Sequence, residues 1–138
     1  GMNNPSPAMA DFRLLLTGYD TVECAYYLRP LEGCQLNFQQ LGIEKESLRQ
    51  ARSKDPKVVT LGGMDFFLYS HGTGRGYPFL IKNEDFTIEF GEFNDPSFFV
   101  TFRSLALWRE GAFALHQRFL AWATTLGLEP YRLERLCL

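Results

Sequence analysis

The strongest constraint on the fold is a run of three short predicted strands, residues 77–82, 86–93 and 97–103, and in the last two of them residues alternate between the two faces of the strand. In residues 86–93, for example, Phe86, Ile88 and Phe90 fall on one side of the chain and polar residues lie between them. Alternation with period two is typical of strands that bury one face. Because the turns at residues 83–85 and 94–96 are short, neighbouring segments are expected to pair antiparallel, as a meander.

Further strands and two helices are expected around this meander. The same alternation predicts strands over residues 20–31, 57–61, 64–70 and 131–138. Gly62-Gly63 is interpreted as a bulge or bend within one strand. An apolar spacing of three to four residues predicts helices over residues 37–54 and 109–126, the second with a wide apolar arc that ends at Gly127.

These elements predict an α+β fold with two layers, in which an antiparallel sheet of about five to six strands carries two helices on one face. A chain of 138 residues has the length of one domain. Residues 1–17 are expected to form a flexible N-terminal tail, and residues 18–138 a single α+β domain.

The charge of the chain is close to balanced, with a formal net charge of −2. A domain that binds duplex DNA usually carries a basic excess, so the overall charge argues against such a domain. The distribution is uneven, because residues 45–57 are predominantly basic and residues 84–95 are acidic. Two solvated surface patches also explain this pattern.

The three cysteines, Cys24, Cys34 and Cys137, have no metal-binding spacing. They are interpreted as buried thiols in a reducing cytoplasm, with Cys137 an inert thiol on a strand. No apolar run approaches the roughly 18 residues that span a bilayer. We therefore expect a cytoplasmic protein with no membrane partner.

No complete catalytic site is legible in the chain. The glycine-rich segment 71–76 lies between two predicted strands and lacks the ending of a phosphate loop, so it is interpreted as a hairpin turn that presents Arg75 to an anion. Neither His71 nor His116 has a second residue at the spacing of a metal-binding motif. His116 falls within the second predicted helix and is expected to be a partly buried packing residue. We expect no catalytic residues, no metal and no cofactor in this chain alone.

The sheet face away from the helices is a candidate surface for a partner or a second domain. Alternation assigns it five side chains: Thr87, Glu89, Thr101, Arg103 and Tyr77. The alternative is that Phe99 and its neighbours on this face lie under a loop or under the N-terminal tail.

Four segments resemble, in the same order, the N-terminal part of plasmid and phage replication initiation proteins of the rolling-circle type (the replication initiation factor family). They are Gly18-Tyr-Asp-Thr21, Gly72-Thr-Gly-Arg-Gly-Tyr-Pro-Phe79, Phe98 to Ser104 running into Leu107-Trp-Arg-Glu-Gly111, and Leu133 to Leu138. The resemblance implies a sheet-centred α+β fold. In full-length members it implies DNA nicking by a tyrosine and a divalent metal.

The chain departs from that family at the last strand. The family's strand carries an aspartate that is suspected of a role in the active site, and the corresponding position here is Cys137. The chain also stops where the half that bears the nucleophile would follow. The resemblance therefore implies a domain that is non-catalytic on its own, either as a truncated product or as a domain retained for another use.

Two functions remain open from the sequence. The first is a replication-initiator-like domain that binds DNA or a partner of the replication machinery. Its candidate contacts for DNA or another anion are Arg75, Arg103, Arg135, Lys45, Arg49, Arg52 and Lys57. The alternative is a module of mobile-element origin that either self-associates through the terminal strand or binds another protein, and that has no nucleic-acid role.

Overall fold

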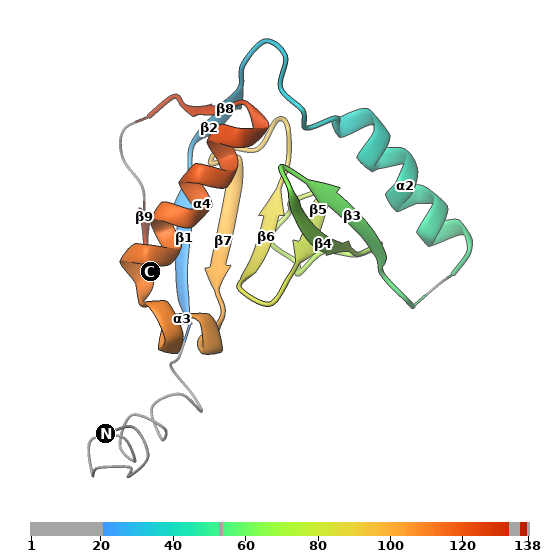
Figure 1. The fold of residues 1–138 in the computed structure, drawn as a ribbon. Helices are drawn as coiled ribbons and strands as arrows, with labels where there is room; N and C mark the ends of the chain where they lie inside the picture. Colours follow the sequence, from blue (N-terminus) through green and yellow to red (C-terminus); the bar gives the residue numbers. More distant parts are fainter. Residues whose placement is uncertain (1–20, 53, 133–135, 138) are drawn as a thin grey trace, which may run out of the picture.

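A computed structural model describes residues 21–52, 54–132 and 136–137. Its largest element is a seven-stranded antiparallel sheet with the order β3-β4-β5-β6-β7-β1-β9 (Figure 1). The strands are β1 Val22–Tyr26, β3 Lys57–Leu61, β4 Met64–Leu68, β5 Phe79–Lys82, β6 Phe86–Phe90, β7 Phe98–Phe102 and β9 Leu136–Cys137. The predicted α+β fold on an antiparallel sheet is confirmed, with the two-residue β9 added to six longer strands.

The core lies between one face of the sheet and helix α4, Ala112–Leu126, which crosses β1 and β7 in Figure 1. Phe119 of α4 is fully buried, and its ring contacts the rings of Tyr26, Phe86 and Phe98 from three strands. His116, one turn earlier, is buried beside Tyr26, whose hydroxyl lies 2.7 Å from its Nδ1. The expected packing role of His116 is confirmed.

Helix α2, Phe38–Gln50, packs on the same face near the other side of the sheet. It begins where predicted, because the side chain of Asn37 caps the helix by accepting a bond from the Gln40 backbone N–H at 3.0 Å. The Phe38 ring lies against the rings of Phe79 and Phe90. Two helices therefore cover one face, as expected, and the opposite face carries no helix in the described part of the chain (Figure 1).

The predicted helix over residues 109–126 is wrong in its first turn. Two helices occupy this region, α3 from Ser104 to Glu110 and then α4, and they are separated by Gly111 at a φ of 84°. A positive φ breaks the continuity of a right-handed helix and suits glycine, which has no side chain to clash. The helix predicted to reach residue 54 likewise ends at Gln50.

The predicted strand over residues 20–31 is split between two sheets. After β1, residues Leu28–Pro30 form β2, which pairs antiparallel with β8, Leu128–Pro130, in a separate two-stranded sheet. Of the predicted last strand, residues 131–138, residues 131–132 are not in a strand and residues 136–137 form β9, while the others lie outside the described residues. The predicted tail, residues 1–17, lies outside the described residues.

Gly62-Gly63 forms a two-residue turn, and the interpretation of a bulge within one strand is wrong. Both residues have positive φ, 57° and 79°, and β3 and β4 pair along their whole length on either side. Gly62 also lies against α4, where Trp122 Nε1 donates to the Leu61 carbonyl at 2.8 Å. A Cβ on Gly62 would lie 3.0 Å from that nitrogen.

Two of the cysteines are paired, which corrects the interpretation of reduced thiols. Cys24 of β1 and Cys137 of β9 lie opposite each other in the strand pairing and form a disulfide. Cys24 is buried, as expected, but Cys137 is exposed and is not an isolated thiol. Cys34, half-buried, is the free cysteine of the described residues. A search of those residues for a helix able to cross a membrane finds none.

Candidate functional site

The helix-free face of the sheet carries a continuous row of side chains. Successive strands place them opposite one another, and alternation turns them away from the core. From one edge inward, the row is Val58, Phe67, Lys82, Thr87, Thr101 and Glu23. Thr87 and Thr101 thus share this face, as expected.

A second row on the same face is covered by the loop between β4 and β5. Glu89 and Phe99 lie opposite each other in this row and are buried. The Arg75 guanidinium lies 4.0 Å from the centre of the Phe99 ring, so Phe99 lies under a loop, as the alternative expectation held. Burial, aided by the charge of Glu89, raises the pKa of the Tyr77 hydroxyl, which donates to the Pro96 carbonyl at 2.8 Å.

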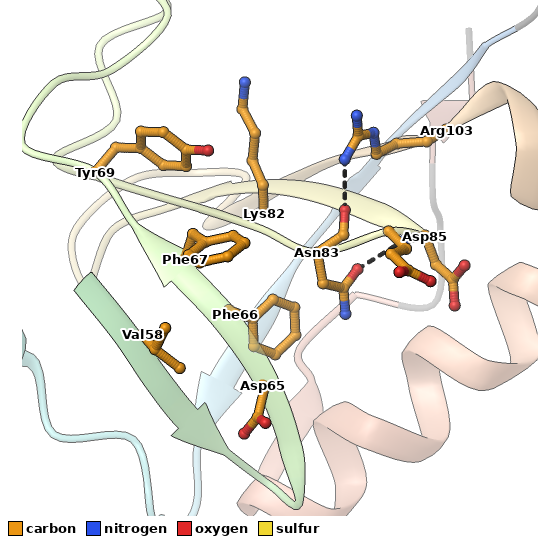
Figure 2. A pocket seen from close by; sticks show the side chains of 10 residues that line it. Val58, Asp65, Phe66, Phe67, Tyr69, Lys82, Asn83, Asp85 and Arg103 are labelled. Atoms are coloured by element: carbon orange, nitrogen blue, oxygen red, sulfur yellow. Dashed lines mark hydrogen bonds between the residues drawn. The ribbon is translucent and has the colours of Figure 1, made fainter. Parts of the chain in front are cut away.

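The uncovered row contains an open groove of about 600 Å³ (Figure 2). Phe67 forms part of its wall and is 46% exposed, although it is a large apolar side chain on a strand. Tyr69 lies beside it, just beyond the end of β4. The lining residues are Val58, Asp65, Phe66, Phe67, Tyr69, Lys82, Asn83, Glu84, Asp85 and Arg103.

Two cations border the aromatic part of the groove. Lys82 Nζ lies 5.2 Å from the centre of the Tyr69 ring, within the range of a cation–π contact. Arg103 follows β7, and its Nη1 donates to the Asn83 carbonyl at 2.6 Å (Figure 2). This hydrogen bond holds the Arg103 side chain at the end of the groove away from Tyr69. The groove thus offers one exposed ring, that of Phe67, with Lys82 beside it and Arg103 at the far end.

The acidic residues of the groove differ in their availability. The Asp85 carboxylate is paired with Arg109 at 2.8 Å and with Arg118. Asp65 accepts a bond from the Thr60 hydroxyl at 2.6 Å, and Glu84 is exposed. With Asp85 neutralised, the lining has no net positive charge.

An ion cluster joins this wall to the helices. Besides Asp85, Glu110 contacts both Arg109 and Arg118, at 2.8 and 2.9 Å. The hydrogen bond from Arg109 holds the pKa of the Glu110 carboxyl below its usual range, with a smaller effect from Arg118. The cluster ties the turn between β5 and β6 to α3 and α4, and so holds one end of the groove in place.

Two smaller cavities share walls with the groove and lengthen it. One of about 210 Å³ meets it at Tyr69 and reaches Lys54 and His71. The other, of about 410 Å³, meets it at Glu84 and Arg103 and reaches Arg109. Together they make an extended track across one end of the sheet face.

The structure does not gather the cations that the sequence singled out. Arg103 lines the groove. Arg75 is held by carboxylates, with its Nε 3.1 Å from Glu89 and its Nη2 3.4 Å from Glu23. Arg135 lies outside the described residues.

The basic segment 45–57 lies on and after α2, and none of its described cations lines the groove itself, although Lys54 lines the smaller cavity that meets the groove at Tyr69. Lys45 donates to the Pro78 carbonyl at 2.5 Å, and Lys57 pairs with Glu44 at 3.1 Å. Arg49 lies 3.6 Å from Glu46, and Arg52 is exposed in the turn that follows the helix. Most of this segment's charge is therefore met by its own neighbours.

Three groove residues, Phe67, Tyr69 and Lys82, were not among the sequence candidates. Their signal is in the alternation of β4, where Asp65, Phe67 and Tyr69 fall opposite the buried Phe66 and Leu68. Asp65 and Tyr69, two residues before and two residues after Phe67, share its side of the strand and carry polar groups, which indicates that the Phe67 ring faces away from the core. The position of Lys82 beside Tyr69 depends on how β5 pairs with β4, which a single sequence does not reveal.

Among residues 21–52, 54–132 and 136–137, no group of three or more His, Cys, Asp or Glu side chains is placed to hold a metal ion. Comparisons with protein-family models, with curated proteins and with solved structures find no match to the chain. The function is therefore argued from the groove and from the sequence resemblance.

Proposed function

We propose that this chain is a replication-initiator-like domain, non-catalytic on its own, that binds single-stranded DNA along the groove. The observation that carries the proposal is the exposed Phe67 ring, which lies opposite Lys82 in the strand pairing and lines the same groove as Tyr69 and Arg103. A cytoplasmic location belongs to the same proposal because it follows from the replication role, and it no longer rests on the cysteines, since Cys24 and Cys137 are paired.

Exposed aromatic rings on a sheet face suit single strands. Unpaired bases present flat faces that stack on aromatic side chains, at about 1–3 kcal/mol per base. In a duplex these faces are already stacked on each other. Phe67 offers such a ring, whereas Tyr69 is half-buried, contacts Lys82 and His71, and forms the wall beside it. Val58, which is 57% exposed beside Phe67, extends the apolar contact.

The charges of the groove suit a modest electrostatic contribution. Lys82 and Arg103 can each meet one phosphate, while Asp65 and Glu84 limit the attraction. For single strands the logarithm of the binding constant falls with the logarithm of salt concentration, with a slope of about −0.7 for each phosphate contact. Two contacts predict a slope of about −1.4, which is shallow for a nucleic-acid-binding protein.

The proposal is tested by fluorescence anisotropy with a labelled oligothymidylate and with a duplex of the same length. We expect measurable affinity for the single strand at low salt, and weaker binding to the duplex. Tighter binding to the duplex would contradict the groove as a stacking surface. No binding to either at low salt would contradict the proposed function.

Self-association through the terminal strand is the alternative function. In the structure β9 pairs with β1 at Cys24 and Ala25, so any second copy would have to pair with the other side of a two-residue strand. A mass measurement in solution tests it, since a stable dimer would favour the alternative and a monomer at high concentration would count against it.

A further inference from the structure

Residues 71–76, which we name the strap, lie over the buried row of the helix-free face. All six residues are exposed, and three of them are glycines. Gly74 and Gly76 have positive φ, 93° and 90°. The strap therefore has little apolar anchoring of its own, and polar contacts hold it to the sheet.

The main latch is a buried carboxylate. Glu89 is 3% exposed, and its carboxylate accepts a hydrogen bond from the Thr73 hydroxyl. It also forms an ion pair with Arg75, whose Nε lies 3.1 Å away. Arg75 reaches a second carboxylate, Glu23, at 3.4 Å. A further contact joins the Asn94 side chain to the Gly76 carbonyl at 3.2 Å.

The strap covers a third aromatic ring next to the groove. Phe99 is 9% exposed, and the central carbon of the Arg75 guanidinium lies over its ring, 4.0 Å from the ring centre. Phe99 lies two residues from Thr101 on β7, and Thr101 belongs to the same open row as Phe67 and Lys82. Lifting the strap would therefore extend the open row with one more ring and one more cation.

We infer that the strap is a gate over a second part of the single-strand site, with Phe99 as a further stacking ring and Arg75 as a further phosphate contact. This inference rests on the proposed function of the groove. A phosphate would take Arg75 from Glu89 and Glu23, water would solvate Glu89 once the strap lifts, and a base would stack on Phe99. Only molecules with an open strap can bind at this second part of the site, so its apparent affinity equals the affinity of the open form multiplied by the fraction of molecules that are open.

The test compares Glu89→Gln with Glu32→Gln, which removes the same charge from an exposed turn between β2 and α2, outside the strap. Trypsin cleavage after Arg75 reports opening, because a protease needs the loop released from the sheet. We expect Glu89→Gln to be cut about fivefold faster or more, since charge-assisted hydrogen bonds become neutral ones. Glu32→Gln should be cut at the wild-type rate.

The decisive comparison is between cleavage and affinity. If the strap gates the site, Glu89→Gln binds oligothymidylate more tightly than Glu32→Gln, by a factor similar to its gain in cleavage rate. Faster cleavage with equal affinity overturns the gate, and so does unchanged cleavage. If neither variant nor the wild type binds, the proposed function fails, and the cleavage rates still report whether Glu89 holds the strap.

A second variant keeps the test independent of folding at the buried position. Thr73→Val changes only the exposed strap and removes one hydrogen bond to Glu89. It is expected to shift cleavage and affinity in the same direction as Glu89→Gln, by a smaller factor. Thermal unfolding of each variant confirms that the comparison is made on folded protein.

Discussion

Phe67 and Phe93 are both phenylalanines that leave their rings exposed, but their surroundings differ. Phe67 is on β4, inside the groove and opposite Lys82, whereas Phe93 is 92% exposed in the turn between β6 and β7. A ring held on a strand loses little freedom when a base stacks on it, because the backbone is already fixed. At the scale of single residues, Phe67 is therefore the side chain on which the proposed function depends most.

Phe67→Ala is expected to weaken binding of oligothymidylate by about 1–3 kcal/mol, the range for one stacked base. Phe93→Ala is the matched control, since it removes the same ring from a site outside the groove, and it should bind as the wild type does. Anisotropy titrations of both variants measure the difference. Equal losses of affinity in the two variants would contradict the groove as the binding site, because a ring outside it would then contribute as much as Phe67.

The β3–β4 hairpin is the element that carries the aromatic part of the groove, and its turn is fixed against α4. Gly62 is confined by both its backbone and its neighbour, whereas Gly63 has only the backbone requirement, because nothing lies within 4 Å of its missing Cβ. The hydrogen bond from Trp122 to Leu61 depends on that close approach. The turn thus couples the orientation of the hairpin to the core.

Gly63→Ala is expected to lower the free energy of unfolding by about 1 kcal/mol, the cost of a left-handed backbone at a residue with a side chain. Gly62→Ala should cost about 1 kcal/mol more, since Trp122 must shift and its hydrogen bond weakens. Urea unfolding of both variants gives the two values. Equal destabilisation would show that the contact with Trp122 contributes nothing.

Alternation was sufficient to predict the meander and the face on which its phenylalanines are buried. It could not predict helix continuity at Gly111, where a single positive φ separates α3 from α4. It could not predict the neighbours of Lys82 either, because the long loop between β4 and β5 leaves their pairing open in sequence. The groove was missed for that reason, while Arg103 was found because it continues the alternation of β7.

At the scale of the whole molecule, the disulfide joins β9 to β1, two strands that are neighbours in the sheet but far apart in the sequence. Cys24 and Cys137 are separated by 113 residues, so the bond closes most of the chain into one loop. A cross-link of this kind restricts the unfolded chain more than the folded one. The chemical state of this pair therefore affects the stability of the entire sheet.

Reduction is expected to lower the free energy of unfolding by about 2–5 kcal/mol. Cys137→Ser should match the reduced wild type and be insensitive to reductant, whereas Cys34→Ser should respond to reductant as the wild type does. Urea unfolding with and without dithiothreitol measures this. Wild-type protein that shows three reactive thiols after denaturation without reductant would contradict the pairing.

The central claim is that the groove on the helix-free face binds the single strand and that the basic segment after α2 does not. The most direct test is the salt dependence of oligothymidylate binding by Lys82→Gln/Arg103→Gln and by Arg49→Gln/Arg52→Gln. The first variant should lose the wild-type slope of about −1.4, at about 0.7 for each lost contact, and the second should keep it. An unchanged slope in the groove variant together with a lost slope in the α2 variant would contradict this claim.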